Sequence, residues 1–277
     1  RIGDLLAADA GQQGSLFTAI SLDQSAVYST GSAVNEFMVA SSGPVRLAAI
    51  PGAPGSDAAI YNALTRTSSH LMARELTRRT QVAESGAGQL DSALAGIGDF
   101  NLPPTTLGLQ LNMVVRLIAA RSALGMKRQT YFVSLGGFDL HNGMASTHGP
   151  LLQEVGDAMA AFQTAMNTAG LGDQVLSFTA SDFGRALTIN GDGTDHGWAG
   201  HHLVMGGAVK PKQWVGAVPR CELGAADEVG QGRMLPAISV DQLGATLATW
   251  MGVPDSDLAT VFPNIGEFAT RTLDLLR

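Results

Sequence analysis

Two short apolar runs with a helical pattern between them constrain the fold of this chain more than any other sequence feature. The first run, TYFVSL (130–135), is continuous and β-branched, which is typical of a strand buried on both faces. After Pro150, apolar residues recur every three or four positions and indicate a helix. The second run, QVLSFTA (174–180), predicts another strand. A strand–helix–strand crossover makes its strands parallel, so we predict an α/β fold with a mostly parallel sheet and helices on both faces.

The rest of the chain adds elements of the same kinds. Residues 15–22 (SLFTAISL) have the composition of a strand, and residues 107–125 have the spacing of a helix that ends at a glycine. Ser239 and Gln242 form the capping box of a late helix. A further helix is expected from Asp57, the Gly/Pro-rich residues 41–56 are expected to be loop, and residues 86–106 are expected to cross the surface. No internal repeat is present, so we predict one domain over residues 1–277.

Charge and hydropathy exclude several classes of function. The chain has 277 residues and a net charge of −7 without a basic block, which argues against a nucleic-acid partner. Its apolar runs are shorter than the about 18 residues of a membrane-spanning helix, so no transmembrane segment is expected. The chain opens with RIGDLLAAD, which has the pattern of a helix already under way rather than of a signal peptide, and this suggests a cut end.

Polar side chains follow the predicted strands where a ligand site is expected. Asp139 and His141 come after the first strand, and Asp182 and Arg185 come after the second. Asp195 and His196 lie in a glycine-rich segment that can fold back over the same edge. The carboxylates and imidazoles in this set are typical ligands of a divalent metal, with Zn, Mn or Ca as candidates. Arg185 is suited to contact a tetrahedral oxyanion.

Simpler interpretations stay open for three of these residues. Asp182 can cap the turn after its strand, Asp195 can form an Asx-turn, and Arg185 can pair with Asp182 alone. The chain has no G-x-S-x-G, P-loop, G-x-G-x-x-G or H-E-x-x-H motif, which argues against serine hydrolases, nucleotide enzymes and dehydrogenases. Metal-assisted chemistry and binding remain.

Three stretches resemble a known bacterial family of the alkaline phosphatase and sulfatase-like clan. They are FVSLGGFDLH (132–141), FTASDFGRALTINGDGTDHGWAGHHLVMGGAV (178–209) and MGVPDSDLATVFPNIGEF (251–268). The resemblance implies export with a twin-arginine signal, hence a periplasmic or secreted location, and hydrolysis of phosphate or sulfate esters at a metal site. Carried over by position, Asp139 and His141 resemble ligands that follow a central strand. Asp182 resembles the aspartate of the clan's Ser-Asp-His-Gly motif, and His196 resembles its late histidine ligand.

Two departures from the clan pattern shape the predicted function. Phe183 replaces the histidine of Ser-Asp-His-Gly, so at most one tightly bound ion is expected. The clan's first strand, with its aspartate and nucleophile, is expected upstream of Arg1. We therefore expect the N-terminal part of the fold to be missing from these residues, and no residue of this chain is assigned as nucleophile. An upstream segment, a partner chain or residues from LFTAISL would complete the sheet, and we favour the first.

The sequence therefore leaves two functions open. The preferred one is an exported metal-dependent hydrolase of phosphate or sulfate esters, whose substrate is a small molecule or a polymer. The alternative is a non-catalytic secreted or surface protein that retains the fold for binding or assembly.

Overall fold

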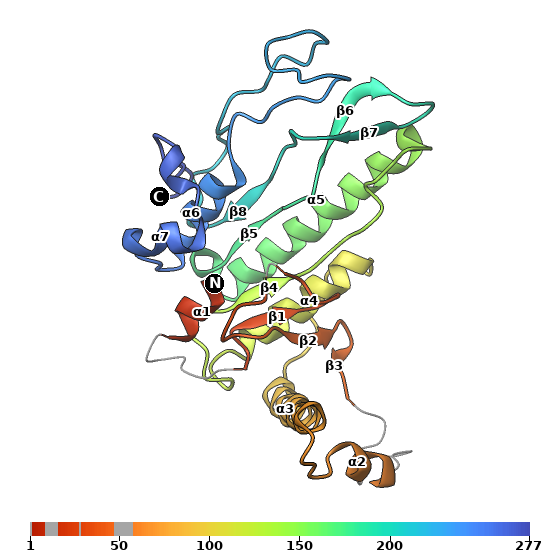
Figure 1. Ribbon diagram of the computed structural model, residues 1–277, viewed down its shortest axis with the longest axis vertical. Coiled ribbons are helices and arrows are strands. Elements are labelled where there is room, and N and C mark those ends of the chain that lie inside the picture. The colour runs from red at the N-terminus through yellow and green to blue at the C-terminus, as the bar shows by residue number, and fades with distance from the viewer. Residues whose placement is uncertain (1, 9–15, 28, 47–57) are drawn as a thin grey trace. The chain divides into compact units, whose positions relative to one another are not determined.

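The described part of the chain divides into two compact units. The computed structural model describes residues 2–8, 16–27, 29–46 and 58–277 (Figure 1). The first unit consists of Gly3–Phe100 and Gln110–Ser134, and the second of Asn101–Leu109 and Leu135–Arg277.

The first unit is built around a four-stranded sheet. Its strand order is β3 (Gly43–Pro44), β2 (Phe37–Ala40), β1 (Ala19–Ser21) and β4 (Thr130–Phe132). β1 is parallel to both β2 and β4, whereas β2 and β3 are antiparallel. All three residues of β1 are buried, as expected for a strand with a neighbour on each side and apolar cover. The predicted α/β class and mostly parallel sheet are thus confirmed.

The neighbour of β4 bears on how the sheet is completed. Residues 19–21 of the predicted strand LFTAISL pair with residues 130–132, with Ile20 opposite Tyr131. A strand from the first forty residues therefore lies beside β4. This is the arrangement in which LFTAISL completes the sheet, whereas an upstream segment was the favoured expectation. The proposal of an upstream segment stays a prediction.

Among the described residues of the first half of the chain, four helices begin, and they correct two predicted helix boundaries. They are α1 (Ile2–Ala7), α2 (Ala58–Leu64), α3 (Leu71–Leu94) and α4 (Thr106–Ala119). The helix expected from Asp57 is two helices, with a break at residues 65–70, and Asp57 itself and residues 47–56 of the expected loop lie outside the described residues. The helix predicted over 107–125 is present as α4, with Leu111, Val114 and Ile118 buried, but it ends at Ala119 and not at Gly125.

The expectation that residues 86–106 cross the surface is wrong for the end of α3. Gly86, Ala87 and Leu90 are buried on this helix. A Cβ atom at Gly86 would lie 2.5 Å from the side chains of both Leu16 and Phe37. The glycine therefore serves close packing of α3 against the sheet and is not a turn signal.

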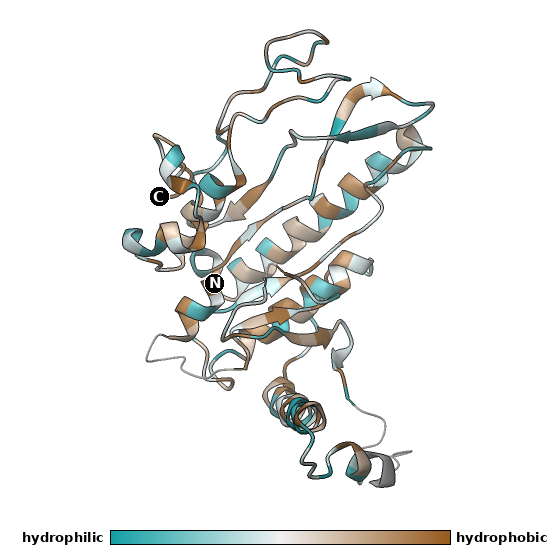
Figure 2. Cartoon of the chain, viewed as in Figure 1, coloured by the Kyte–Doolittle hydropathy of each residue, from teal (hydrophilic) through white to brown (hydrophobic). Residues whose placement is uncertain are grey.

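The second unit contains two small antiparallel sheets and the longest helix. Its elements are α5 (Met144–Thr168), η1 (Gly172–Gln174), β5 (Leu176–Phe178), β6 (Gly184–Ile189), β7 (Thr194–Gly197), β8 (Val204–Gly206), α6 (Val240–Trp250), α7 (Asp255–Val261) and η2 (Ile265–Glu267). β5 pairs with β8, and β6 pairs with β7 as a hairpin. Apolar and polar residues alternate along α5 (Figure 2), and its buried face includes Met159, Phe162 and Met166. The capping box of Ser239 and Gln242 is formed at the start of α6.

Two features of the predicted strand–helix–strand unit differ in the structure. The helix starts at Met144, before Pro150, because Asp192 accepts hydrogen bonds from the N–H groups of Gly143 (2.9 Å) and Met144 (3.1 Å). These contacts satisfy N–H groups at the helix start that have no partner within the helix. β5 pairs with β8, and the described ladders do not join β4 and β5 in one sheet. The crossover rule applies only to strands that share a sheet, and the sequence does not specify that condition.

No helix among the described residues combines the length and the apolar character needed to cross a bilayer.

Candidate metal centre

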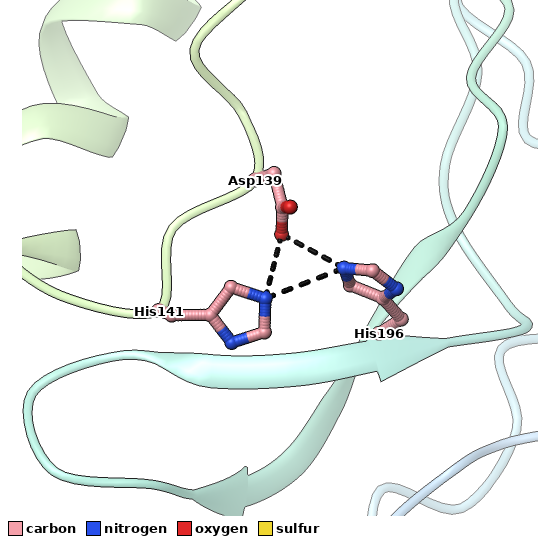
Figure 3. A group of neighbouring side chains, drawn as sticks. All are labelled: Asp139, His141 and His196. Atoms are coloured by element: carbon pink, nitrogen blue, oxygen red, sulfur yellow. Dashed lines mark hydrogen bonds and ion pairs between the residues drawn. The ribbon is translucent and has the colours of Figure 1, made fainter.

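Three of the predicted site residues converge on one point (Figure 3). Asp139 Oδ1 lies 3.0 Å from His141 Nε2 and 2.9 Å from His196 Nε2. The two imidazole nitrogens are 3.3 Å apart. Asp139 and His196 are exposed and His141 is partly exposed, so a ligand from solvent can reach the group. We call these three residues the Asp–His–His cluster.

The cluster joins a loop to a β-hairpin. Asp139 and His141 lie in the segment between β4 and α5, and His196 lies on β7. The N–H of Thr194 on β7 donates to the carbonyl of Leu140 at 3.2 Å, which attaches the loop to the hairpin. Gly193 makes this approach possible, because a Cβ atom there would lie 2.3 Å from the Leu140 oxygen. Asp139 and His141 are far from His196 in sequence, but backbone contacts hold the loop and the hairpin together.

Arg185 on β6 links the same loop to the hairpin through hydrogen bonds from its guanidinium group. Its Nη1 donates to Asp139 Oδ1 at 2.7 Å, and its Nη2 donates to the carbonyl of Leu140 at 2.7 Å and to the carbonyl of Thr194. Its Nε donates to the Thr194 hydroxyl at 2.9 Å. The hydrogen bond from Arg185, and the weaker one from His196, hold the pKa of Asp139 below its ordinary value. Asp139 is therefore a carboxylate, the form that binds a cation.

Asp195 and Asn190 approach His141 on the side of the ring away from the cluster. Asp195 Oδ1 is 3.4 Å and Asn190 Nδ2 is 3.3 Å from His141 Nδ1. Asn190 Nδ2 also donates to Asp195 Oδ1 at 2.5 Å. Asp195, predicted as a ligand, thus lies against the nitrogen that does not face the cluster.

His196 is held in a different way. Its ring stacks on Phe183, with centroids 4.1 Å apart and planes at 19°. The Arg185 guanidinium carbon lies 5.8 Å from the centre of the same phenyl ring, within reach of a cation–π contact. Phe183, considered from the sequence only as the loss of a ligand, is a surface that orients His196.

The sequence-based set of candidate residues is therefore brought together in part. Asp139, His141 and His196 form the cluster, Arg185 binds Asp139 rather than Asp182, and Asp195 contacts His141. Asp182 is exposed and is not a member of the cluster. The sequence did not indicate the role of Asn190 or the stacking of Phe183 on His196. The spacing of five residues between Asn190 and Asp195 predicts their contact only when the β6–β7 hairpin is known.

The cluster fits a divalent ion of the kind that nitrogen and oxygen ligands bind. An ion about 2.0–2.2 Å from each ligand in tetrahedral geometry separates its ligands by about 3.3–3.6 Å. The separations from Asp139 to the two histidines, 2.9 and 3.0 Å, are a few tenths of an ångström shorter, and the separation between the histidine nitrogens, 3.3 Å, lies at the lower end of that range. Exposed side chains adjust over that range by small rotations, so the residues are compatible with three-point binding that leaves a position open.

Comparison with known proteins gives a family but no activity. Residues 54–266 match the family model described as a protein of unknown function (DUF1501), which is more than half of the chain. Searches of curated proteins and of solved structures found no match.

Proposed function

This chain belongs to the DUF1501 family, and we propose that it is a metal-dependent hydrolase of phosphate or sulfate esters. The observation that carries the proposal is the convergence of Asp139 Oδ1, His141 Nε2 and His196 Nε2 within 3.3 Å of one another. Three protein ligands with an open position are the usual arrangement of a catalytic zinc site, whereas structural sites are closed by four.

The charge of Asp139 and of the chain as a whole favours cation binding, whereas the Arg185 guanidinium beside Asp139 opposes it. Asp139 supplies a carboxylate with a lowered pKa, and the chain has a net charge of −7. Neutral imidazole is a ligand for Zn²⁺ and similar ions, and two such groups face Asp139. An ion held there would act as a Lewis acid on an ester oxygen and lower the pKa of a bound water.

The protein residues contribute position and charge. Asp139, His141 and His196 hold the ion at the surface of the hairpin, where an ester on a small molecule or a polymer can approach. Arg185 keeps Asp139 in place and puts a permanent positive charge beside the site. We keep Arg185 as the candidate contact to the substrate oxyanion, through the Nη1 nitrogen that already donates to Asp139.

The resemblance to the alkaline phosphatase and sulfatase-like clan agrees with this chemistry and is part of the proposal. We extend the proposal to an alkaline phosphatase-like fold and to export into the periplasm or medium. The mixed, mostly parallel sheet of the first unit is compatible with that fold.

A second candidate is a non-catalytic protein that binds through the same site. The observation that favours it is the use of all three Arg185 nitrogens as donors to Asp139, Leu140 and Thr194. An arginine engaged in this way fixes a loop, and a substrate oxyanion would have to compete for it.

Metal binding and hydrolysis by the 277-residue chain separate the two candidates. Wild-type protein is titrated with Zn²⁺, Mn²⁺ or Ca²⁺ and assayed with aryl phosphate and aryl sulfate esters. We expect one equivalent of ion, an affinity loss in His196→Ala well beyond tenfold, and hydrolysis that requires the ion. The matched control is His70→Ala, an exposed histidine of the first unit, which should bind as wild type does.

Other results of the titration and the assay would favour the second candidate or contradict the ligand assignment. Ion binding without ester hydrolysis would support the binding protein if it persists when an upstream segment is present, because no residue of this chain is assigned as nucleophile. Two stoichiometric ions, or unchanged affinity in His196→Ala, would show that the ligands are misassigned.

A further inference from the structure

We propose that Asp195 and Asn190 are positioning residues for His141. Asn190 supports the tautomer with its proton on Nε2, Asp195 supports the tautomer with its proton on Nδ1, and the pair thereby prepares the ring to bind the ion. The inference deepens the proposed metal site and rests on it. It concerns the Nδ1 side of the His141 ring, which both residues contact and which faces away from the three converging ligand atoms.

The geometry places one acceptor and one donor beside the same ring nitrogen. His141 Nδ1 lies 3.4 Å from Asp195 Oδ1 and 3.3 Å from Asn190 Nδ2. The side-chain amide of Asn190 has its nitrogen toward Asp195, because at 2.5 Å the carboxylate oxygen requires a donor opposite it. Turning the amide would place two oxygens at that distance. The pair therefore offers His141 a carboxylate oxygen and an amide N–H together.

A neutral imidazole carries one proton, on one of its two nitrogens. Without an ion, the proton is best placed on Nε2, because Asp139 Oδ1 is 3.0 Å away and accepts it. Nδ1 is then an acceptor, and Asn190 donates to it. His141 in this state has a partner at each nitrogen.

Binding of an ion requires the opposite tautomer. The Nε2 lone pair faces the cluster and must be free of its proton to act as a ligand. The proton then lies on Nδ1, where Asp195 Oδ1 is the acceptor. The proton therefore changes nitrogen and is not lost from His141. A carboxylate behind a metal-binding histidine orients the ring and raises its basicity.

The hairpin explains why these two residues act as a unit. Asn190 follows β6, Asp195 lies on β7, and the N–H of Asn190 donates to the Gly193 carbonyl at 3.0 Å across the turn. Asp195 and His196 are adjacent on one strand, so they point to opposite faces, one toward the back of His141 and the other toward Asp139. One strand thus supplies both a ligand and the support of a second ligand.

The test uses the whole chain, Zn²⁺ as probe and ¹⁵N NMR of the histidine rings at a pH where they are neutral. We expect wild-type His141 to carry its proton on Nε2 without Zn²⁺ and on Nδ1 with Zn²⁺. Asp195→Asn keeps the size of the side chain and removes the carboxylate, and it should weaken Zn²⁺ binding by about 10–100-fold. Asn190→Leu removes the donor, and it should shift the metal-free tautomer toward Nδ1–H.

A role limited to hairpin stability predicts other results. In that case the urea midpoint would fall in both variants while the tautomer of His141 stayed the same. Zn²⁺ binding that Asp195→Asn leaves unchanged, or the same His141 tautomer with and without Zn²⁺, would overturn this inference and leave the metal site standing. Absence of Zn²⁺ binding by the wild-type chain would overturn the metal site and this inference together.

Discussion

The β1–β4 ladder and the β6–β7 hairpin are both pairs of short strands, but different forces hold them. In β1 every residue is buried, and Ala19 and Ile20 are fully inaccessible to solvent. In the hairpin, Asp195 and His196 are exposed, and most of β6 beyond Ala186 is exposed as well. The hairpin is held by the Arg185 hydrogen bonds and by close backbone contacts at Gly184, Gly193 and Gly197.

The difference separates stability from site geometry. Apolar burial stabilises β1 whatever the details of its neighbours, whereas the cluster depends on a few directional contacts. Substitutions of buried residues in the sheet should therefore lower the free energy of unfolding most, and substitutions in the hairpin should weaken ion binding while the fold persists.

The largest expected effect on stability is at Ile20. Ile20→Ala removes a fully buried side chain from β1 and leaves a cavity, which should cost about 2–5 kcal/mol of unfolding free energy. Urea denaturation followed by circular dichroism measures the change. Met38→Ala on β2 is the matched control, because its side chain is 44% exposed and its loss should cost far less. Equal losses in the two variants would show that burial does not distinguish the strands.

The second prediction concerns Gly193 and the attachment of the loop to the hairpin. An alanine there places Cβ 2.3 Å from the Leu140 oxygen and 2.5 Å from the His141 oxygen, so the loop must move away from β7. We expect Zn²⁺ affinity to fall by about tenfold or more, as for loss of an outer partner of a ligand. Isothermal titration calorimetry measures it.

Gly200→Ala is the control for that prediction, since its Cβ would have only an ordinary contact, 3.9 Å from Gly184. The urea midpoint of Gly193→Ala should change much less than that of Ile20→Ala. A midpoint as low as that of Ile20→Ala would mean that the hairpin contributes to the fold as strongly as the sheet.

The smallest expected effect is the pH dependence due to Asp139. Arg185 lowers the pKa of this carboxyl, so its ionic contacts contribute stability above the ordinary aspartate pKa, and the contribution is lost as the pH falls through the lowered value. Arg185→Gln should raise the pKa of Asp139 toward its ordinary value. Carboxyl ¹³C NMR of the metal-free chain measures it. Arg220→Gln, an exposed arginine in another segment, should leave it unchanged, and an unaltered pKa in Arg185→Gln would contradict the assigned cause.

The fold was predictable where the signal was local and hydrophobic. The runs at 130–135 and 174–180 each contain a strand, and Leu111, Val114 and Ile118 are buried at the expected spacing. The end of α3 was not predicted because Gly86 is a packing glycine. It leaves space for the Phe37 side chain, and no local sequence pattern indicates that contact. The start of α5 was missed because Asp192, 48 positions beyond Met144, satisfies the first N–H groups.

The candidate site shows the same division. Residue types alone identified Asp139, His141 and His196 as possible ligands, because carboxylates and imidazoles among glycines are suited to cation binding. The partners of Arg185 and the position of Asp195 behind His141 were open, since hydrogen-bond direction depends on how the hairpin meets the loop.

The sequence by itself determined the chemical nature of this protein: an acidic α/β chain with strands where apolar runs occur, and a set of carboxylates and imidazoles without a thiolate. Burial and side-chain chemistry are properties of residue type, so they can be inferred without coordinates. The tertiary structure alone decided that His196 rather than Asp182 completes the cluster, and that Phe183 and Asn190 serve the two histidines. These outcomes depend on distances of a few ångströms between segments far apart in sequence, which only the packing of the hairpin against the loop fixes.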